Sequence, residues 1–206
     1  MSRGARVAVL VSALISLFTV LSTASEAVTW HSLGDTSFTA TTGPSTLSST
    51  GVDFTCPSGT AVGTVAAAPF IGVTWPAFHG TITRTGCRLI GQDSSMDCSY
   101  TLTAQGHSGG VIGGVTNGTL DVTCSVYIVG TKFCHVHGSV SATYTNPTIM
   151  PSIHGTLATF TGGDLFITRS SPFPTSPCPL GNFDRGHLSP QSFVTNGLGP
   201  ILTRTA

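Results

Sequence analysis

From residue 28 onward, apolar side chains recur at every second position, and no stretch keeps a helical period over ten or more residues. The clearest segment runs from Gly118 to Val129, where polar residues alternate with Leu120, Val122, Cys124, Val126 and Ile128. The segment from Cys134 to Thr145 repeats this pattern. Such strands place one face in a core and the other in solvent. The sequence therefore predicts an all-β fold.

Further short strands are predicted between turn-forming residues. They are Ser37–Thr42, Leu47–Cys56, Thr60–Ala67, Gly80–Leu89, Cys98–Ala104, Gly155–Thr161, Asp164–Arg169 and Gln191–Thr195. Many short strands at this spacing indicate a disulfide-stapled antiparallel β-sandwich or a β-barrel-like Greek-key domain. The length suits one domain over residues 28–206.

The first 27 residues have the pattern of an export signal. Arg3 and Arg6 precede an apolar run over residues 7–21 that is too short to cross a bilayer comfortably as a helix. Small residues at Ser25 and Ala27 predict cleavage after Ala27, with Ala24 as the second choice and an uncleaved anchor as the alternative. No later segment is apolar enough to span a membrane, so a secreted protein is expected.

All six cysteines follow this signal: Cys56, Cys87, Cys98, Cys124, Cys134 and Cys178. An even number in an exported chain predicts three disulfides. Metal ligation is the alternative, but no pair has the Cys-x-x-Cys spacing typical of zinc sites. Four of the six share the parity of core residues, and a bulge at Gly86 would turn Cys87 inward as well. The residues leave 15 pairings open. A surface loop held by Cys178 is expected at Pro172–Pro179.

Charge is sparse and balanced, with 8 Lys and Arg against 8 Asp and Glu and 8% charged residues overall. The basic residues form no cluster, which excludes a nucleic-acid binder. Serine and threonine fill the outward strand positions that charged residues usually occupy. No cofactor motif is present.

Two motifs are candidates for a catalytic site. Gly106–Gly110 matches the G-x-S-x-G pattern around Ser108, but no helix is predicted after it, which favours a flexible loop over a hydrolase nucleophile. Asp93 and Asp97 are closely spaced carboxylates in a predicted polar loop over residues 91–97, where a solvated loop is the simpler interpretation. The residues supply no complete set of nucleophile, base and orienting group.

Two weak binding sites are also candidates. His135 and His137 lie on one outward strand face and could share a metal, although no third ligand is placed near them and a solvated face is the alternative. Exposed aromatics could stack on sugars, with Trp75, Phe78 and Tyr127 as the candidates beside Trp30. Ordinary core packing is the competing interpretation for these rings.

Several segments resemble a group of uncharacterised secreted β-proteins of high-GC actinobacteria, and more loosely the secreted alkane-oxidation activator family. The likeness rests on residues 52–56, 59–65, 82–87, 138–146 and 178–181. It implies a secreted all-β domain without known enzymatic activity. It also implies that Cys98 and Cys124 are an added pair, which gives the pairing Cys56 to Cys87, Cys98 to Cys124 and Cys134 to Cys178.

The expected function is that of a secreted, non-enzymatic structural or adhesive protein outside the cell, attached non-covalently to the cell envelope. The first alternative is a carbohydrate-binding module for wall or environmental polysaccharide. The second is a secreted hydrolase.

Overall fold

The computed structural model describes residues 28–129, 131–148, 155–159, 164–169, 178–181, 184–197 and 199–205. The predicted export signal and most of the proline-rich segment lie outside these described residues. Within them the chain forms strands and turns and no helix. The all-β prediction is therefore confirmed.

The described residues form fifteen strands. They are β1 (Thr29–Leu33), β2 (Ser37–Thr42), β3 (Ser45–Ser49), β4 (Val52–Cys56), β5 (Gly59–Val65), β6 (Phe70–Ile71), β7 (Trp75–Leu89), β8 (Gln92–Ser108), β9 (Val115–Ile128), β10 (Thr131–Thr145), β11 (Thr156–Thr159), β12 (Asp164–Arg169), β13 (Asp184–Leu188), β14 (Gln191–Thr195) and β15 (Ile201–Thr205).

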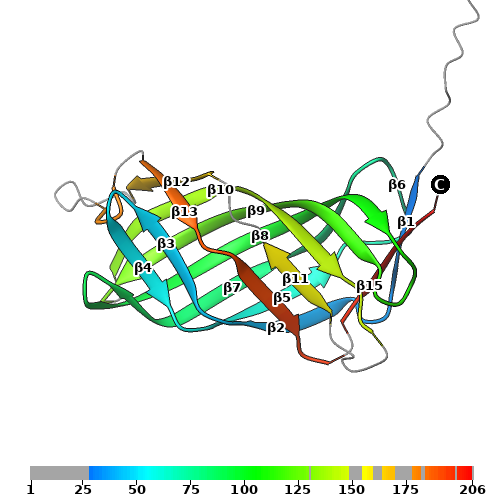
Figure 1. Cartoon of the computed structure of the whole chain (residues 1–206), viewed down its shortest axis with the longest axis horizontal. Coiled ribbons are helices and arrows are strands. Elements are labelled where there is room, and N and C mark those ends of the chain that lie inside the picture. Colours follow the sequence, from blue (N-terminus) through cyan, green and yellow to red (C-terminus); the bar gives the residue numbers. More distant parts are fainter. Residues whose placement is uncertain are drawn as a thin grey trace, which may run out of the picture.

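The main sheet closes into an eight-stranded antiparallel barrel (Figure 1). Four wall positions are the long strands β7, β8, β9 and β10, each paired with the next along the chain. Each of the other four positions consists of two short strands end to end: β2 with β3, β4 with β5, β11 with β12, and β13 with β14. Pairing of β14 with β2 and of β13 with β3 closes the ring.

The order of the strands in the barrel wall distinguishes this barrel from one with Greek-key connections. Every wall position pairs with its neighbours in chain order, so the barrel is an up-and-down meander. Of the two predicted architectures, the barrel is the one observed. Alternating polarity looks the same in both, because it records which face is buried and not which strand is next.

In three of the four short-strand positions the interruption coincides with proline. The breaks fall at Gly43-Pro44, Pro57-Ser58 and Ser189-Pro190, where proline removes a ladder donor. Opposite the Pro57-Ser58 break, β7 has the predicted bulge at Gly86, where its register shifts between Arg84 and Cys87. We call this level of the barrel the waist.

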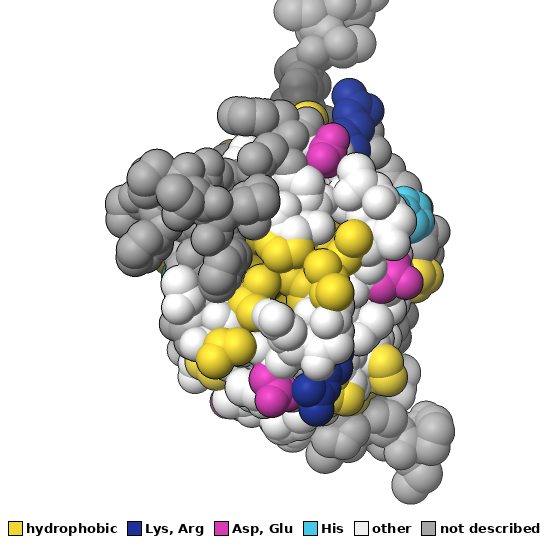
Figure 2. Space-filling model, turned by 90° about the vertical axis from the view of Figure 1, so that its left-hand side faces the viewer, with side chains coloured by type: hydrophobic (Ala, Val, Ile, Leu, Met, Phe, Trp, Pro, Cys, Tyr) yellow, Lys and Arg dark blue, Asp and Glu magenta, His cyan; other side chains and the backbone are white. Residues whose placement is uncertain are grey.

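The two ends of the barrel are closed differently. A separate three-stranded sheet in the order β15-β1-β6 lies across one end (Figure 1). At the other end are tight hairpins and the segment around Cys178, and apolar side chains gather near the middle of that end (Figure 2). Exposed apolar residues at its hairpin tips include Ile90 and Val129, both with positive φ.

Three disulfides staple the barrel, with the pairing Cys56–Cys87, Cys98–Cys124 and Cys134–Cys178. This is the pairing that the family resemblance implied, so that prediction is confirmed. All six cysteines are buried. Two of the bridges join directly neighbouring wall strands, β4 to β7 and β8 to β9.

Several predicted boundaries differ from the structure. Leu47–Cys56 is a hairpin with a turn at Thr50-Gly51, and Thr50 has a φ of 49°. The predicted loop at residues 91–97 belongs almost entirely to β8. Strands β1, β6, β13 and β15 are short and had not been predicted.

Candidate functional site

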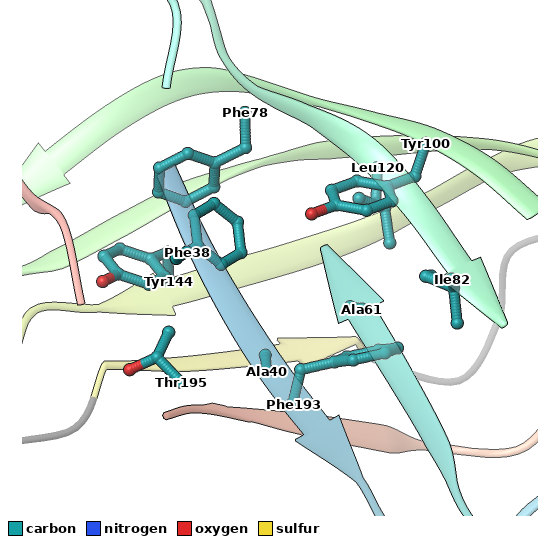
Figure 3. A pocket seen from close by; sticks show the side chains of 10 residues that line it. All are labelled: Phe38, Ala40, Ala61, Phe78, Ile82, Tyr100, Leu120, Tyr144, Phe193 and Thr195. Atoms are coloured by element: carbon teal, nitrogen blue, oxygen red, sulfur yellow. The ribbon is translucent and has the colours of Figure 1, made fainter. Parts of the chain in front are cut away.

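The half of the barrel nearest β1 is filled by an aromatic cluster (Figure 3). Phe78 packs edge to face against Phe38 and Tyr144, with ring centroids 5.2 and 4.8 Å apart. The cavity among these side chains is about 10 Å³, measured as the space open to the centre of a water molecule. That is room for about one water, so no ligand is enclosed here.

The other half of the barrel holds a second small cavity. Measured in the same way it is about 30 Å³. Its lining is apolar apart from Arg84 and Gln191. Eight strands can enclose either packed side chains or one small ligand, and this interior is packed.

Arg84 is a guanidinium buried at the waist, with 1% of its surface exposed. It donates to Gln191 Oε1 at 2.6 Å, to Thr42 Oγ1 at 3.2 Å and to the Gly43 carbonyl oxygen at 3.3 Å. It also lies over the Phe193 ring, 5.9 Å from the centroid. No carboxylate among the described residues lies within ion-pair distance of it.

These contacts give Arg84 a structural role. Gly43 and Gln191 flank two of the breaks in the wall, so one side chain joins strands that the prolines interrupt. Burial lowers the pKa of Arg84 to about 10, which leaves it protonated at neutral pH. A role for Arg84 was not predicted from the sequence, although its side chain shares the inward parity of Ile82.

At the barrel end that is covered by the three-stranded sheet, Asn146 ties this sheet to the barrel. Its side chain is 1% exposed. It donates to the Leu202 carbonyl oxygen at 2.8 Å and accepts from the Leu202 N–H at 2.9 Å. It also donates to the carbonyl oxygens of Val111 and Gly110, at 3.2 and 3.4 Å. The amide thus takes the place of a neighbouring strand for Leu202 of β15.

The predicted sugar-stacking platform is wrong for most of its rings. Trp75 and Phe78 are buried, as is Trp30, whose ring centroid lies 6.1 Å from that of Trp75. They close the barrel end beneath the three-stranded sheet and pack the interior. Tyr127 alone of the candidates reaches the outer face of β9, where it is half-buried. The residues 75–78 looked like a loop because of Pro76, but they begin β7 at a bulge.

The serine motif does not form a nucleophile elbow. Ser108 is the last residue of β8 and is exposed, and the segment after it is a turn leading to β9. His107 bonds Thr116 Oγ1 at 2.9 Å through Nδ1. Burial lowers the pKa of His107, helped by the charge of Arg204 and opposed by a hydrogen bond to Gly109. This geometry anchors a loop and offers no catalytic pair.

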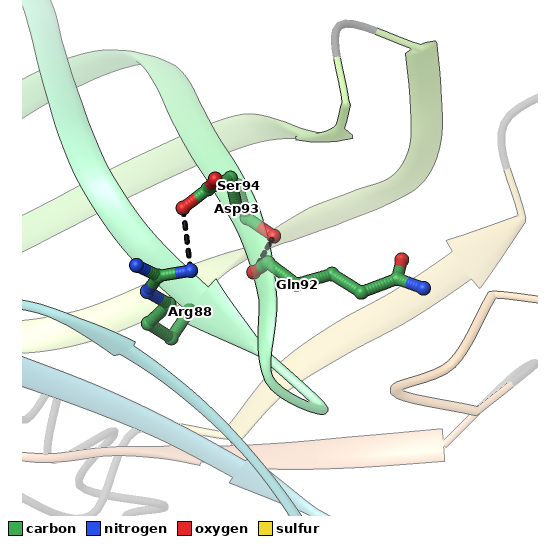
Figure 4. A network of polar contacts seen from close by, with 4 residues as sticks. All are labelled: Arg88, Gln92, Asp93 and Ser94. Carbon is green, nitrogen blue, oxygen red and sulfur yellow. Dashed lines mark hydrogen bonds and ion pairs between the residues drawn. The ribbon is translucent and has the colours of Figure 1, made fainter.

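The two predicted acidic residues, Asp93 and Asp97, also lie on the outer face of a strand. Asp93 forms an exposed ion pair with Arg88, 2.5 Å between Oδ1 and Nη1 (Figure 4). Beside it, Ser94 Oγ donates to the Gln92 carbonyl oxygen at 3.1 Å. Asp97 is exposed on the same outer face. Next to Arg88 is an open groove of about 440 Å³ between Pro44 and Pro57.

The two histidines do share an outer face, as predicted. Their ring centroids on β10 are 5.5 Å apart. Among the described residues, no group of three or more His, Cys, Asp or Glu side chains is arranged to hold a metal ion. His135 and His137 are therefore a pair without a third ligand in the described part of the chain.

Two residues that the sequence analysis had not singled out extend this pair into a row. Phe166 stacks on His137, with centroids 5.9 Å apart and planes inclined by 27°. The guanidinium carbon of Arg185 lies over Phe166, 5.7 Å from its centroid. We call His135, His137, Phe166 and Arg185 the planar row. Parity could have found Phe166, because Leu165 and Ile167 on either side face inward.

Comparisons with protein-family models, curated proteins and solved structures found no match. Within the described residues there is no helix long and apolar enough to cross a membrane.

Proposed function

We propose that this protein is secreted and acts outside the cell as an adhesive, envelope-associated protein that binds through its outer wall. The observation that carries the proposal is the filled interior, with cavities of about 10 and 30 Å³. A barrel packed in this way offers its ligands only its outer surface.

Two further features support this proposal. Three disulfides are typical of proteins that fold in oxidising compartments. The outward positions of the long strands are dominated by serine and threonine, which keep the wall polar with little net charge. Such a wall suits repeated weak contacts with a hydroxyl-rich surface.

The test is fractionation of the native host culture into medium, wall and membrane. Intact mass and peptide mapping without reduction would then be applied to the recovered protein. We expect recovery from the wall fraction, release by salt or free glycan, an N-terminus at Val28 and three disulfides. Recovery as a freely soluble protein in the medium, with no affinity for isolated walls, would contradict the adhesive function.

Carbohydrate binding is the second candidate function, and the planar row is the observation that favours it. Phe166 is 45% exposed on the outer wall and is flanked by an imidazole and a guanidinium. The exposed part of this ring offers an apolar contact, and its polar neighbours bond hydroxyl groups. Retention of the protein on immobilised polysaccharide would support this candidate.

A further inference from the structure

The barrel end that carries the three-stranded sheet exposes an unusual number of aliphatic side chains. Ten large apolar residues are exposed in the described part of the chain, and five of them lie at this end. Each of the five exposes between 45% and 70% of its surface. We call them the end face: Leu33, Ile71, Val73, Val111 and Ile112.

Backbone pairing brings one part of the end face together around β15. Leu33 ends β1 and lies opposite Ile201 of β15. The next residue of β15, Leu202, and the turn at Val111 both bond the side-chain amide of Asn146. The turn that carries Val111 and Ile112 is therefore held beside the edge of the sheet.

The rest of the end face lies along the other edge of the same sheet. Ile71 of β6 is opposite Thr29 of β1. The Gly72 N–H donates to the Val28 carbonyl oxygen at 2.9 Å, which places Val73 beside the start of β1. The five side chains thus border one small sheet at one end of the molecule (Figure 1).

Packing does not account for the apolar residues of the two loops. Val111 and Ile112 form the tip of a turn between the bridged residues Gly110 and Gly113. Such positions favour glycine, asparagine, aspartate and serine. Here two aliphatic side chains are exposed instead, and Ile71 is the most exposed of the five at 70%.

The outward side of the sheet carries almost no charge. Trp30 and Leu202 are buried, so the residues that alternate with them face away from the barrel, and none of these is Lys, Arg, Asp or Glu. Arg204 turns inward, with its guanidinium carbon 5.4 Å from the Trp30 ring centroid. Asp35 is exposed in the turn after β1, outside the sheet. An apolar phase could therefore cover the sheet without desolvating a charge.

The chain also enters the fold at this end. β1 begins at Thr29, and the apolar run of the predicted export signal ends at Leu21. At about 3.5 Å a residue, an extended chain between them spans at most about 30 Å. While the apolar run is in a membrane during export, the end face is held close to that same bilayer.

We propose that the end face docks on a lipid bilayer, with its aliphatic side chains at the boundary between headgroups and acyl chains. A stable interface with a second copy would need about 20–30 residues a side, far more than this face offers. Docking through it stands the barrel on its end and leaves the outer wall free. The inference goes beyond the proposed adhesive function and does not depend on it.

The experiment is flotation of the mature chain, residues 28–206, with phosphatidylcholine vesicles, which have no net charge. This chain contains every described strand but lacks the apolar run, which would bind lipid by itself. We expect the protein to float with the vesicles. Because the contact is apolar, added salt should change the partitioning by less than about twofold.

Two double variants remove apolar groups from separate loops of the end face: Ile71→Ser with Val73→Ser, and Val111→Ser with Ile112→Ser. Val62→Ser with Ile90→Ser is the matched control, because it removes the same residue types from exposed positions on the wall and at the opposite barrel end. Each end-face variant should weaken partitioning at least about tenfold, and the control should stay within about twofold. The melting temperature would establish that all three variants fold.

Four outcomes would overturn the inference. They are no flotation, partitioning that salt abolishes, unchanged partitioning in both end-face variants, and an equal loss in the control. Sedimentation of the mature chain without lipid tests the other occupant. A dimer that becomes monomeric in the Ile71→Ser, Val73→Ser variant would assign the face to a second copy and also overturn the inference. Binding to isolated walls is measured separately, so the adhesive function can stand or fail independently.

Discussion

Replacing Asn146 by alanine should detach the three-stranded end sheet from the barrel. The contacts of Asn146 set upper and lower limits on the free energy of unfolding that would be lost. The amide supplies both a donor and an acceptor to Leu202, which is itself fully buried. After truncation, the N–H and the carbonyl oxygen of Leu202 would have no partner. Each unsatisfied buried group costs about 1–3 kcal/mol, so the expected loss is about 2–6 kcal/mol. The carbonyl oxygens of Gly110 and Val111 are in an exposed turn and can bond water instead.

The assay is urea unfolding with the disulfides intact, followed by far-UV circular dichroism and by tryptophan fluorescence. Both tryptophans lie at the end that Asn146 secures, so fluorescence reports on that end. Asn117→Ala is the matched control, because Asn117 is exposed on β9. We expect Asn146→Ala to lower the urea midpoint strongly and the control to leave it within experimental error.

Asn146→Asp gives the same test a pH signature. A carboxylate can still accept from the Leu202 N–H, but it faces the Leu202 carbonyl oxygen without a proton to donate. Folding should therefore raise the pKa of this carboxyl, and the lost stability should return as pH falls through that raised pKa. A loss below about 1 kcal/mol in Asn146→Ala, or a pH-independent loss in Asn146→Asp, would refute the reasoning.

Three other predictions follow from the wall and its turns. Removing the Cys98–Cys124 bridge with paired alanines should cost about 3 kcal/mol by the chain-entropy model while the barrel persists; an unchanged melting temperature would contradict this. Ile90→Asn should stabilise the protein by about 1 kcal/mol, because Ile90 is 66% exposed at a φ of 50°; a lower urea midpoint would contradict it. Burial lowers the pKa of His107, so protonation favours the unfolded chain and stability should fall below about pH 6.5. That fall should be shallower in His107→Gln, and identical pH profiles would count against the assignment.

Prediction from the sequence was most accurate for features that depend on a local pattern. Period-two alternation located β2, β12 and β14 at their observed bounds. It also placed the cysteines on the inward face, including Cys87 behind its bulge. Closure into a meander barrel could not be predicted from alternation, because ring closure joins β14 to β2, which lie some 150 residues apart in the chain.

The candidate site was predicted only in part, for a related reason. The outward direction of His135 and His137 follows from parity within one strand. Their neighbours Phe166 and Arg185 come from two other strands, and only the registers of β10 with β12 and of β12 with β13 bring them together. Trp75 and Phe78 had been predicted to be exposed because they lie beside a proline in a segment that resembles a loop. Instead they begin β7 and their side chains are buried.

The waist links the packed interior to the proposed use of the outer wall. Proline breaks would leave backbone acceptors such as the Gly43 carbonyl without ladder partners, and Arg84 reaches across the interior to satisfy this one. Its charge also occupies the middle of the barrel, where an apolar ligand would otherwise have to lie. Burying a guanidinium without a carboxylate is costly, and this chain bears that cost in a position that joins β2 to β14. The break before Gln191 separates β14 from β13, which carries Arg185 on its outer face. A rigid, filled barrel is thus a means of fixing side chains on the outside, and we expect the protein's specificity to lie there.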